Sequence, residues 1–538
     1  DAIDFDQKEA ETEIEVGAIL LAPGYEPYDA RLSEEFGFGR YPNVVTSLQF
    51  ERLLSPSGPT KGHVQRPSDK RDPRKIAFLQ CIGSRDQKHP YCSSVCCMYA
   101  TKEAMLIKEH HPATDVSIFM MDMRSFGKGF EAYYDRARVE QGVKYIRCRP
   151  SSLKEVAATE NLVVRYQAED GGMVEEEFDM VVLSVGMEPA KGAQDLARAL
   201  DVKLNEDGFC QTSKFAPLDT SRPGVFACGP FVEPCDIPDS VTQASGAAAR
   251  CLEVIGAARG ELAAHKVYPT EIQVDGQEPR IGVFICHCGT NIAGVVDVKS
   301  VAEYARTLPH VVYADTTLYA CAQDNQKNIK DIIEENKLTR LVVAACTPRT
   351  HEPLFQETMR EAALNPFLFE MANIRDQCSW VHSKEPDRAT EKSKALVRMA
   401  VARAALLRPL QRHTIGVNQS ALIIGGGLAG LNAALSLAGQ GFKAYLVERS
   451  GELGGNMRRL RYTMQGQDPQ DYLRGLLERV AAQPLIETIL NAKVVDTAGF
   501  VGNFVSTIEQ DGDKRAIEHG VTIVATGGHE YSGDDYLL

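Results

Sequence analysis

One stretch decides the fold of this chain: Lys75-Ile-Ala-Phe-Leu-Gln-Cys81-Ile-Gly-Ser-Arg-Asp-Gln-Lys-His-Pro-Tyr-Cys92-Ser-Ser-Val-Cys96-Cys97. Its apolar start, 75–80, predicts a buried strand, residues 98–110 predict the following helix, and 115–121 predict a second strand. A βαβ unit that binds a dinucleotide carries G-x-G-x-x-G in its first turn. This turn instead carries four cysteines at the spacing C-x(10)-C-x(3)-C-C, so we expect no dinucleotide there.

The four cysteines predict a metal site. Thiolates from one loop and one helix start can hold an iron–sulfur cluster, and the predicted ligands are Cys81, Cys92, Cys96 and Cys97. The alternatives are a zinc site, or buried cysteines beside a labile disulfide. We favour the cluster because compact zinc sites use C-x(2–4)-C pairs, and adjacent cysteines suit them poorly.

Composition limits the classes of function. The 538 residues predict roughly three or four domains. A formal net charge of −14 disfavours nucleic acid or an anionic membrane as the main partner. Fourteen cysteines without a secretory signal indicate reduced thiols in a cytoplasmic protein. The most apolar long stretch, 421–439, has glycines at a nucleotide-binding spacing, so no membrane insertion is expected.

The chain contains one internal repeat. Glu15-Val-Gly-Ala-Ile-Leu-Leu-Ala22-Pro23-Gly24 resembles Glu518-His-Gly-Val-Thr-Ile-Val-Ala525-Thr526-Gly527. The first copy predicts a strand over 16–21. Both copies are similar to the strand and small-residue turn that flavin disulfide reductases place beside their dinucleotide. A late element of such folds, Gly224-Val-Phe-Ala-Cys-Gly229, comes before the glycine-rich loop that should open them. The protein is therefore either permuted or tandem, with the second half of one module joined to the first half of another. We favour the tandem arrangement, in which this sequence is part of a longer chain.

The predicted fold class is α/β, with doubly wound FAD/NAD(P)-binding folds flanking a small α/β iron–sulfur domain. The predicted domains are the C-terminal half of a thioredoxin reductase-like flavin module at 1–265, with its cluster loop at 81–97; a linker at 266–279; the iron–sulfur domain at 280–412; and the Rossmann half of a second flavin module at 413–538.

The second flavin module is predicted from Gly425-Gly-Gly427-Leu-Ala-Gly430, which follows an apolar strand predicted at 420–424 and opens a helix. These glycines permit the tight turn, the approach of a pyrophosphate and close helix–strand packing. Glu448 ends the next strand, where a carboxylate can accept bonds from the adenosine ribose. The alternative is a Rossmann unit without a nucleotide. Further predicted FAD contacts are Arg449, Gly454, Gly455, Asn456, Val495, Ala525, Thr526 and Gly527.

The predicted iron–sulfur domain holds a second group of cysteines: Cys286, Cys288, Cys321, Cys346 and Cys378. Four of the five are predicted to bind a second cluster, and spacing does not choose between Cys286 and Cys288. The alternative is a buried structural role, because free cysteine is often found in protein cores.

The first half of the chain carries a second predicted flavin site. Its residues are Ala22, Pro23, Gly24, Gly229, Asp236, Ile237, Gln243 and Ala244. Residues 236–244 open a small-residue helix that is predicted at 245–249, and its N-terminus can face the flavin pyrimidine edge. Lys102 lies five residues beyond Cys97 on the predicted helix, so its ammonium could bond flavin N5. The alternative for Lys102 is a solvated surface position.

The chain resembles the flavin-containing iron–sulfur component of heterodisulfide reductase (HdrA), a family of electron-bifurcating and electron-confurcating flavoproteins. The matching motifs are Cys92-Ser-Ser-Val-Cys-Cys-Met-Tyr-Ala-Thr-Lys102, Ile285-Cys-His-Cys-Gly-Thr-Asn-Ile-Ala-Gly294, Ala345-Cys-Thr-Pro-Arg-Thr-His-Glu-Pro-Leu-Phe355 and Gln377-Cys-Ser-Trp-Val-His382. The resemblance implies FAD, [4Fe-4S] clusters in place of the pyridine-nucleotide site, and a lysine beside the flavin at Lys102.

The resemblance also implies partners: ferredoxin-type, hydrogenase-linked or dehydrogenase-linked redox proteins, and HdrB-like and HdrC-like proteins. An oligomeric complex is expected, with any membrane association made through partners. The sequence departs from the family pattern because it has no ferredoxin-type C-x(2)-C-x(2)-C-x(3)-C-P run, and Pro230 follows Gly229 where related flavoproteins have Asp. A linear electron relay of a quinone-interacting complex and a structural cofactor scaffold are the competing functions.

Overall fold

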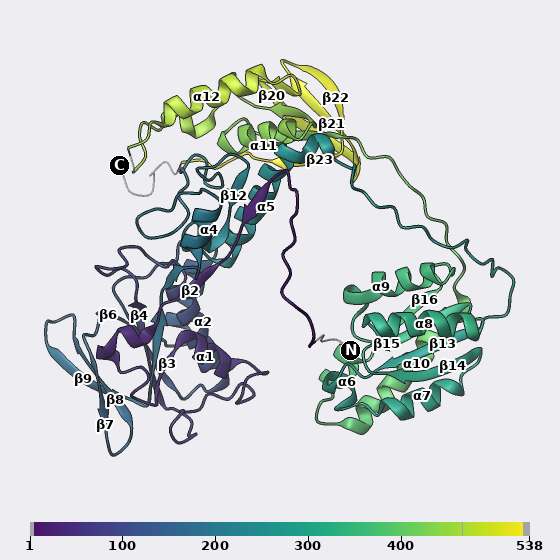
Figure 1. Ribbon diagram of the computed structural model, residues 1–538, viewed down its shortest axis with the longest axis horizontal. Coiled ribbons are helices and arrows are strands. Elements are labelled where there is room, and N and C mark those ends of the chain that lie inside the picture. Colours follow the sequence, from purple (N-terminus) through teal and green to yellow (C-terminus); the bar gives the residue numbers. More distant parts are fainter. Residues whose placement is uncertain (1–4, 465, 531–538) are drawn as a thin grey trace. The chain divides into compact units, whose positions relative to one another are not determined.

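The computed structural model describes residues 5–464 and 466–530, which form two compact α/β units (Figure 1). One unit combines the chain up to Arg259 with the chain from Val417 onward, and the other comprises Gly260–Gly416. Among the described residues, no helix is both long and apolar enough to cross a membrane. Each unit is described separately below.

The cluster loop belongs to a five-stranded parallel sheet in the first unit. In spatial order its strands are β3 (Val44–Thr46), β10 (Met180–Val185), β4 (Lys75–Ile82), β5 (Asp115–Met120) and β6 (Lys144–Arg147). The helices on one face are α1 (Ser47–Leu54), α2 (Cys96–His110) and α3 (Phe130–Val139). The other face packs against an antiparallel sheet of β7 (Leu153–Val156), β8 (Asn161–Gln167) and β9 (Met173–Phe178).

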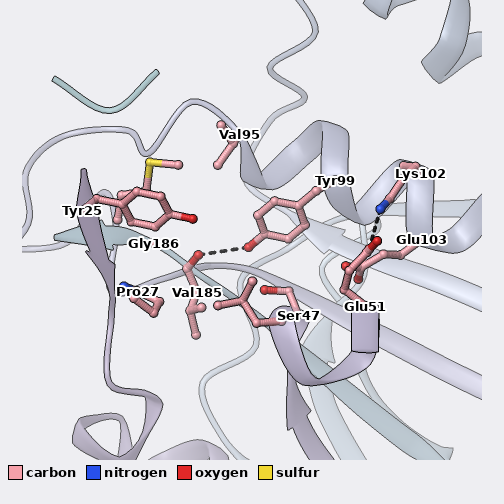
Figure 2. Close-up of a pocket in the computed structure, with 12 residues that line it drawn as sticks. Tyr25, Pro27, Ser47, Glu51, Val95, Tyr99, Lys102, Glu103, Val185 and Gly186 are labelled. Atoms are coloured by element: carbon pink, nitrogen blue, oxygen red, sulfur yellow. Dashed lines mark hydrogen bonds and ion pairs between the residues drawn. The ribbon is translucent and has the colours of Figure 1, made fainter. Parts of the chain in front are cut away.

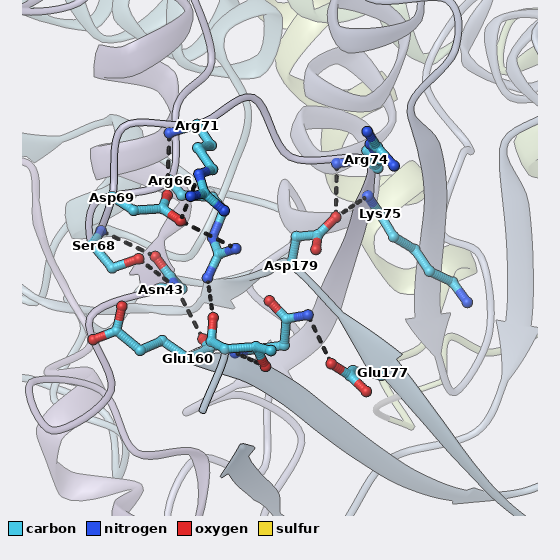
Figure 3. Close-up of polar contacts among 12 residues, drawn as sticks. Asn43, Arg66, Ser68, Asp69, Arg71, Arg74, Lys75, Glu160, Glu177 and Asp179 are labelled. Atoms are coloured by element: carbon cyan, nitrogen blue, oxygen red, sulfur yellow. Dashed lines mark hydrogen bonds and ion pairs between the residues drawn. The ribbon is translucent and has the colours of Figure 1, made fainter. Parts of the chain in front are cut away.

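Side-chain bonds fix the amino-terminal edge of this sheet (Figure 3). The Asp179 carboxylate accepts the backbone N–H groups of Arg74 and Lys75 at 2.7 and 2.9 Å. The Asn43 amide donates to Ser68 Oγ and to the Glu160 carbonyl, both at 2.9 Å. These bonds join the ends of strands that lie far apart in the sequence. The cysteine loop lies at the opposite, carboxyl-terminal edge, where open α/β sheets place their ligands.

The glycine-rich loop belongs to a second parallel sheet with the same architecture. In spatial order its strands are β19 (Ile486–Ile489), β18 (Lys443–Val447), β17 (Ser420–Ile424) and β23 (Val521–Val524). Helices α11 (Leu428–Gly439) and α12 (Pro469–Ala482) cover one face. The antiparallel strands β20 (Ala492–Phe500), β21 (Asn503–Gln510) and β22 (Asp513–His519) cover the other. Both sheets of this unit are therefore covered by helices on one side and by a three-stranded sheet on the other.

The two strands of the internal repeat lie in different sheets. β1 (Ile19–Leu21) pairs in parallel with β12 (Val225–Ala227), whereas β23 pairs with β17. Helix α5 (Ile237–Ile255) contacts both β1 and β12. The shorter elements nearby are β2 (Tyr25–Pro27), β11 (Met187–Pro189), α4 (Ala193–Ala199) and the 3-10 turns η1 (Ala30–Leu32), η2 (Glu34–Phe36), η3 (Gly229–Phe231) and η4 (Gly256–Ala258).

The two parts of the first unit pack against each other. The rings of Phe215 and Tyr472 stack with centroids 4.3 Å apart, and α5 contacts α11. The Arg259 guanidinium donates to the Gln440 carbonyl at 2.6 Å. The late flavin element and the glycine-rich loop thus belong to one compact body, although almost 200 residues separate them in the sequence.

The second unit is a doubly wound parallel sheet. In spatial order its strands are β14 (Val311–Thr317), β13 (Ile281–Cys286), β15 (Arg340–Ala345) and β16 (Phe369–Asn373). Helices α7 (Val298–Arg306) and α10 (Pro386–Leu406) cover one face, and α8 (Gln323–Glu335) and α9 (Pro348–Glu361) cover the other (Figure 1). The short helix α6 (Thr290–Ala293) and the π-helical turn η5 (Arg375–Trp380) complete the unit.

Candidate functional site

The four cysteines of the first group gather at the carboxyl-terminal end of β4. Cys81 is the next-to-last residue of that strand, and Cys96 and Cys97 begin α2. All three are 6% exposed. The sequence predicted a helix from residue 98, and the structure starts it two residues earlier, so the adjacent cysteines belong to its first turn.

Electrostatic interactions connect the four thiols. Burial raises the pKa of Cys97 to about 11, and the thiols of Cys81 and Cys92 add to this rise. Burial also raises the pKa of Cys96 strongly, with contributions from the other three thiols. The four sulfur atoms are therefore near enough to repel one another when ionised. Bound iron would reverse this effect, because a coordinated thiol is held as the thiolate.

The backbone of the cysteine loop adopts conformations that are rare for non-glycine residues. Cys81, Arg85 and Ser94 have φ angles of 60°, 58° and 61°, which non-glycine residues rarely adopt and which cluster at functional sites. The Ser94 N–H points at Cys92 Sγ at 3.3 Å. An N–H directed at sulfur stabilises a thiolate and tunes the potential of a cluster that the thiolate binds.

Positive charge offsets the thiolates at this site. Burial raises the pKa of Cys81, and the guanidinium groups of Arg85 and Arg149 oppose that rise. Asp122 holds Arg85 in place through two bonds, of which the Nη2–Oδ2 contact measures 3.2 Å. A buried anionic cluster needs such compensation, so the surrounding charges fit an iron–sulfur cluster.

Among the described residues, no three Cys, His, Asp or Glu side chains surround one point closely enough for a single metal ion. A cubane cluster binds through four thiolates, each on a separate iron atom. The four cysteines at residues 81–97, two of which are adjacent, fit this donor set better than a compact zinc site, which uses C-x(2–4)-C pairs.

The second unit brings together four of its five cysteines. The sheet order places β13 between β14 and β15, so the carboxyl ends of these three strands carry Cys286, Cys288, Cys321 and Cys346. Burial raises the pKa of Cys346, and the thiols of Cys288 and Cys321 contribute. The pKa of Cys286 is raised by burial and by the same two thiols. The structure thus groups Cys286 and Cys288 together rather than choosing between them.

Two backbone donors face one sulfur of this second group. The N–H groups of Cys288 and Ala320 point at Cys286 Sγ at 3.3 and 3.4 Å. Cys288 itself has a φ of 46°. The arrangement repeats the features of the first group, namely converging thiols, N–H donors to sulfur and a strained backbone, and it fits a second cluster.

No other thiol contributes to the pKa of Cys378. Its side chain is fully buried in the apolar core beneath α10, and Cys288 packs against the same core. Burial raises its pKa, and the Ser393 hydroxyl opposes the rise. It lies in η5, which follows the outer strand β16 and contacts α6, the short helix just after Cys288.

We expect Cys321→Ser to lose the iron of the second cluster and Cys378→Ala to retain it. Cys321 is exposed and contributes to the pKa of Cys286 and Cys346, so its replacement would remove one proposed ligand. No thiol contributes to the pKa of the buried Cys378. Iron content per FAD, with the electron paramagnetic resonance signal of each reduced cluster, measures the difference. Loss of iron in Cys378→Ala with retention in Cys321→Ser would contradict this ligand set.

The glycine-rich loop borders a cavity of about 940 Å³. Gly425 has a φ of 113°, and a Cβ there would lie 2.3 Å from the Ala525 carbonyl oxygen. A Cβ on Gly427 would meet no atom within 4 Å, so this position is open to a ligand. The predicted FAD residues that line the cavity are Gly425, Gly427, Glu448, Arg449, Gly455, Asn456, Ala525, Thr526 and Gly527.

Three predicted residues are placed outside the cavity lining. A Cβ on Gly430 would lie 1.9 Å from the Gly425 carbonyl oxygen, so this glycine permits helix–strand packing. The Gly454 N–H donates to the Gly426 carbonyl at 2.8 Å and joins the two glycine loops. Val495 lies on β20 and is 40% exposed. The sequence did not single out Phe215, which lines the cavity from the first part of the chain, because no spacing relates it to the loop.

Glu448 is tied to the loop as well as facing the cavity. Its Oε2 accepts the Gly426 N–H at 2.7 Å, and its Oε1 accepts the Ser450 N–H at 2.9 Å. Burial acts to raise the pKa of this carboxyl, but the backbone bonds outweigh it and the net shift is downward. Glu448 therefore stays ionised, and a bound ribose would have to share an oxygen that already accepts a backbone N–H.

The residues of the predicted flavin site in the first half surround β12 and the start of α5. Asp236 caps the helix by accepting the Asp239 N–H at 2.8 Å. The Gln243 side chain accepts the Gly229 N–H at 2.8 Å. Helix α5 begins at Ile237, which is 81% exposed, and runs to Ile255, far longer than the 245–249 helix predicted. Ala22, Pro23 and Gly24 follow β1, while Ala244 lies within α5.

Lys102 lines a cavity of about 190 Å³ between α1 and α2 (Figure 2). Its ammonium forms an ion pair with Glu51, and the two side chains are 41% and 46% exposed. The Tyr99 hydroxyl donates to the Val185 carbonyl at 3.0 Å on the cluster side of the cavity. Glu51, Tyr99 and Glu103 were not predicted. Tyr99 and Glu103 lie on α2 with Lys102, and the pairing of α1 with α2 brings Glu51 to them.

The parallel sheets and the glycine-rich loop make this chain similar in fold to flavoprotein disulfide oxidoreductases. The family model described as pyridine nucleotide-disulphide oxidoreductase matches residues 103–249 and 419–533. This match confirms the predicted α/β fold class. The thioredoxin reductase of T. acidophilum is a similar solved structure, at 16% identity and a TM-score of 0.29 over 44% of this chain and 64% of that chain.

The proteins similar in sequence indicate a narrower group of proteins than the family model does. An iron-sulfur subunit of CoB–CoM heterodisulfide reductase from Methanopyrus kandleri is 48% identical over 298 residues, which cover 54% of this chain and 43% of that protein. The corresponding iron-sulfur subunit from Methanocaldococcus jannaschii is 49% identical over 254 residues, 46% of this chain and 38% of that protein. The chain is therefore similar to HdrA, the iron-sulfur flavoprotein of heterodisulfide reductase, and it spans about two fifths of the relatives it matches.

Proposed function

We propose that this chain is an HdrA-like oxidoreductase component, which uses FAD and [4Fe-4S] clusters for electron bifurcation or confurcation. The observation that carries the proposal is the cysteine loop at residues 81–97, because it replaces a dinucleotide turn at the ligand-binding edge of the sheet. When bound, FAD supplies a two-electron carrier and the clusters supply one-electron carriers. The proposed electron partners are low-potential ferredoxin-type carriers and a disulfide, CoA-thioester or other acceptor.

The proposed cofactor sites use the residues described above. Gly425, Gly427 and Glu448 would hold the diphosphate and ribose of one FAD in the 940 Å³ cavity. The helix N-terminus at Asp236 would face a second FAD. The two cysteine groups would each hold one cubane, about eight irons in all. The names of the relatives support the iron–sulfur assignment, since they are described as iron-sulfur subunits.

The sheet topology supports a tandem arrangement of flavin modules. In a single permuted module, β12 would pair with β23, the last strand of the sheet that carries the glycine-rich loop. Here β12 pairs with β1, the other copy of the repeat. The proposed domains remain residues 1–265, a linker at 266–279, 280–412 and 413–538, of which residues 1–4, 465 and 531–538 lie outside the described residues.

Lys102 is the proposed residue beside the flavin. We expect Lys102→Ala to keep FAD and iron but to slow flavin-dependent electron transfer about 100-fold, because it removes a preorganised charge from the site where negative charge develops. Low-potential reduction should become uncoupled from the favourable branch. Stopped-flow measurement of flavin reduction, together with FAD and iron content, checks this expectation.

A matched control lies on the same helix. Lys108 is near the end of α2, and its ammonium bonds the Pro112 and Thr114 carbonyls at 2.8 and 3.0 Å, away from the cavity. Lys108→Ala should leave the rate unchanged. Normal coupling in Lys102→Ala, or an equal effect in both variants, would place Lys102 among ordinary surface lysines.

Purification of the chain with its native partners distinguishes the competing functions. A bifurcating component reduces a low-potential ferredoxin in the same reaction that reduces the second acceptor. A linear relay, as in quinone-interacting complexes, passes electrons to one acceptor alone, and a scaffold shows no flavin reduction during turnover. Proposed partners are ferredoxin-type, hydrogenase-linked or dehydrogenase-linked redox proteins, and HdrB-like and HdrC-like proteins.

A further inference from the structure

The cavity beside Lys102 contains a buried acid with an unsatisfied oxygen. The Glu103 side chain projects from α2 and the residue is 2% exposed. Its Oε2 atom is buried without a hydrogen-bond partner, although buried polar atoms are nearly always bonded. Glu103 lines the same 190 Å³ cavity as Lys102 and Tyr99 (Figure 2). The cavity is lined mostly by apolar groups, and its polar side chains are those of Tyr25, Ser47, Glu51, Tyr99, Lys102 and Glu103.

A second carboxyl lies next to Glu103. Glu51 projects from α1 toward α2, and Figure 2 shows it beside Glu103 and joined to Lys102 by a dashed line. Burial raises the pKa of Glu103 well above its ordinary value, the Glu51 charge raises it further, and Lys102 opposes the rise. A buried acid next to another carboxylate ionises only at high cost, so Glu103 keeps its proton at neutral pH.

The other polar groups in the cavity lining do not supply a free positive charge that would stabilise ionised Glu103. From α2 itself these are Lys102 and Tyr99, and burial raises the pKa of the Tyr99 phenol well above its ordinary value, so it stays neutral. From α1 they are Glu51 and Ser47, and from β2 it is Tyr25. Lys102 is the one cation among these lining residues, and Glu51 already pairs with it.

The exposed fraction differs among Lys102, Glu51 and Glu103. The Lys102 and Glu51 side chains are 41% and 46% exposed, whereas Glu103 is enclosed. Glu51 therefore connects a buried acid on one side with solvent and with an ammonium on the other. A buried acid, a half-exposed carboxylate and solvent in this order can pass a proton between the interior and water.

We propose that Glu51 and Glu103 share one proton and form a relay that exchanges protons between the Lys102 cavity and solvent. This inference rests on the proposed function, in which Lys102 serves the flavin. When the N–H bond of Lys102 breaks and its proton passes to a nitrogen of a reduced flavin bound beside it, the O–H bond of Glu103 breaks as an O–H bond forms on the Glu51 carboxylate. That proton then passes from Glu51 to Lys102 Nζ and restores the ammonium. A proton from solvent enters on the exposed Glu51 carboxylate and passes to Glu103, so the pair takes up one proton for each proton that it gives to Lys102.

Infrared spectroscopy of the FAD- and iron-loaded protein tests the shared proton without reference to activity. At neutral pH the wild type should show the C=O stretch of a protonated carboxylic acid that shifts in ²H₂O. Glu103→Gln should lose this band, and Glu51→Gln should shift it, because Glu103 then has a neutral neighbour. Glu109→Gln, on the exposed end of the same helix, should leave it unchanged. A band that persists unaltered in both Glu103→Gln and Glu51→Gln would overturn the proposal.

A second measurement tests the relay itself. Proton uptake that accompanies flavin reduction, followed with a pH indicator, should slow at least about tenfold in Glu103→Gln and stay normal in Glu109→Gln. Equal uptake rates in wild type and Glu103→Gln would overturn the relay. The proposed function fails differently, since a flavin far from Lys102 would make Lys102→Ala silent while leaving the carboxylic acid band in place.

Discussion

Cys97→Ser should lose one of the two proposed clusters and retain about half of the iron, near four atoms of eight. Cys97 lies in the first turn of α2 and is 6% exposed, so no water or neighbouring side chain can readily replace its thiolate. A serine hydroxyl is a poor ligand for iron because it is harder and much less acidic than a thiol. Iron analysis and the electron paramagnetic resonance spectrum of the reduced protein measure the loss.

Cys148→Ser provides the control for this variant. Cys148 follows β6 in the same sheet and is partly exposed, but it has no place in the cysteine loop. It should retain all the iron. Zinc in place of iron in the wild type, or a disulfide between Cys96 and Cys97, would contradict the proposed cluster.

Gly427→Ala should weaken FAD binding about 10- to 100-fold while leaving the fold intact. Gly427 caps α11 with a φ of −78°, an angle that alanine adopts easily. The new methyl would meet no protein atom within 4 Å, but it would occupy the space into which a pyrophosphate must approach. Overpacking of this kind costs about 1–3 kcal/mol, which corresponds to that range of affinity. FAD titration by fluorescence, with circular dichroism to check folding, measures the effect.

Gly475→Ala is the matched control for the glycine variant. Gly475 lies within α12, where a Cβ meets nothing within 4 Å. Alanine there should stabilise the helix by about 0.5–1 kcal/mol and leave FAD binding unchanged. Full FAD occupancy in Gly427→Ala would mean that the glycine-rich loop serves packing alone.

The sequence was sufficient for features that depend on neighbouring residues. The apolar run that begins at Lys75 forms β4, the strand at Ser420–Ile424 has its predicted bounds, and the loops after both strands lead directly into helices. Strand, turn and helix follow one another along the chain in each case, so hydrophobic periodicity and turn chemistry determine them locally. The same local motifs carry the confirmed resemblance to the iron-sulfur flavoprotein of heterodisulfide reductase.

Local sequence patterns predicted the ends of helices and strands less accurately. The strand expected over residues 16–21 begins only at Ile19, where pairing with β12 starts. Helix α5 extends to Ile255, although its small residues predicted five helical positions. Pairing and packing partners set these bounds, and both are distant in the sequence.

By itself, the sequence determined the two βαβ turns, one built of cysteines and the other of glycines, together with the cysteines available as ligands. Only the tertiary structure decided which of these residues meet. The sheet order β14-β13-β15 gathers Cys286, Cys288, Cys321 and Cys346 and leaves Cys378 in the core. The packing of α1 on α2 brings Glu51 to Lys102 and Glu103, which are neighbours on α2. The physical reason is that burial and charge act through space, and a spacing pattern records only separation along the chain.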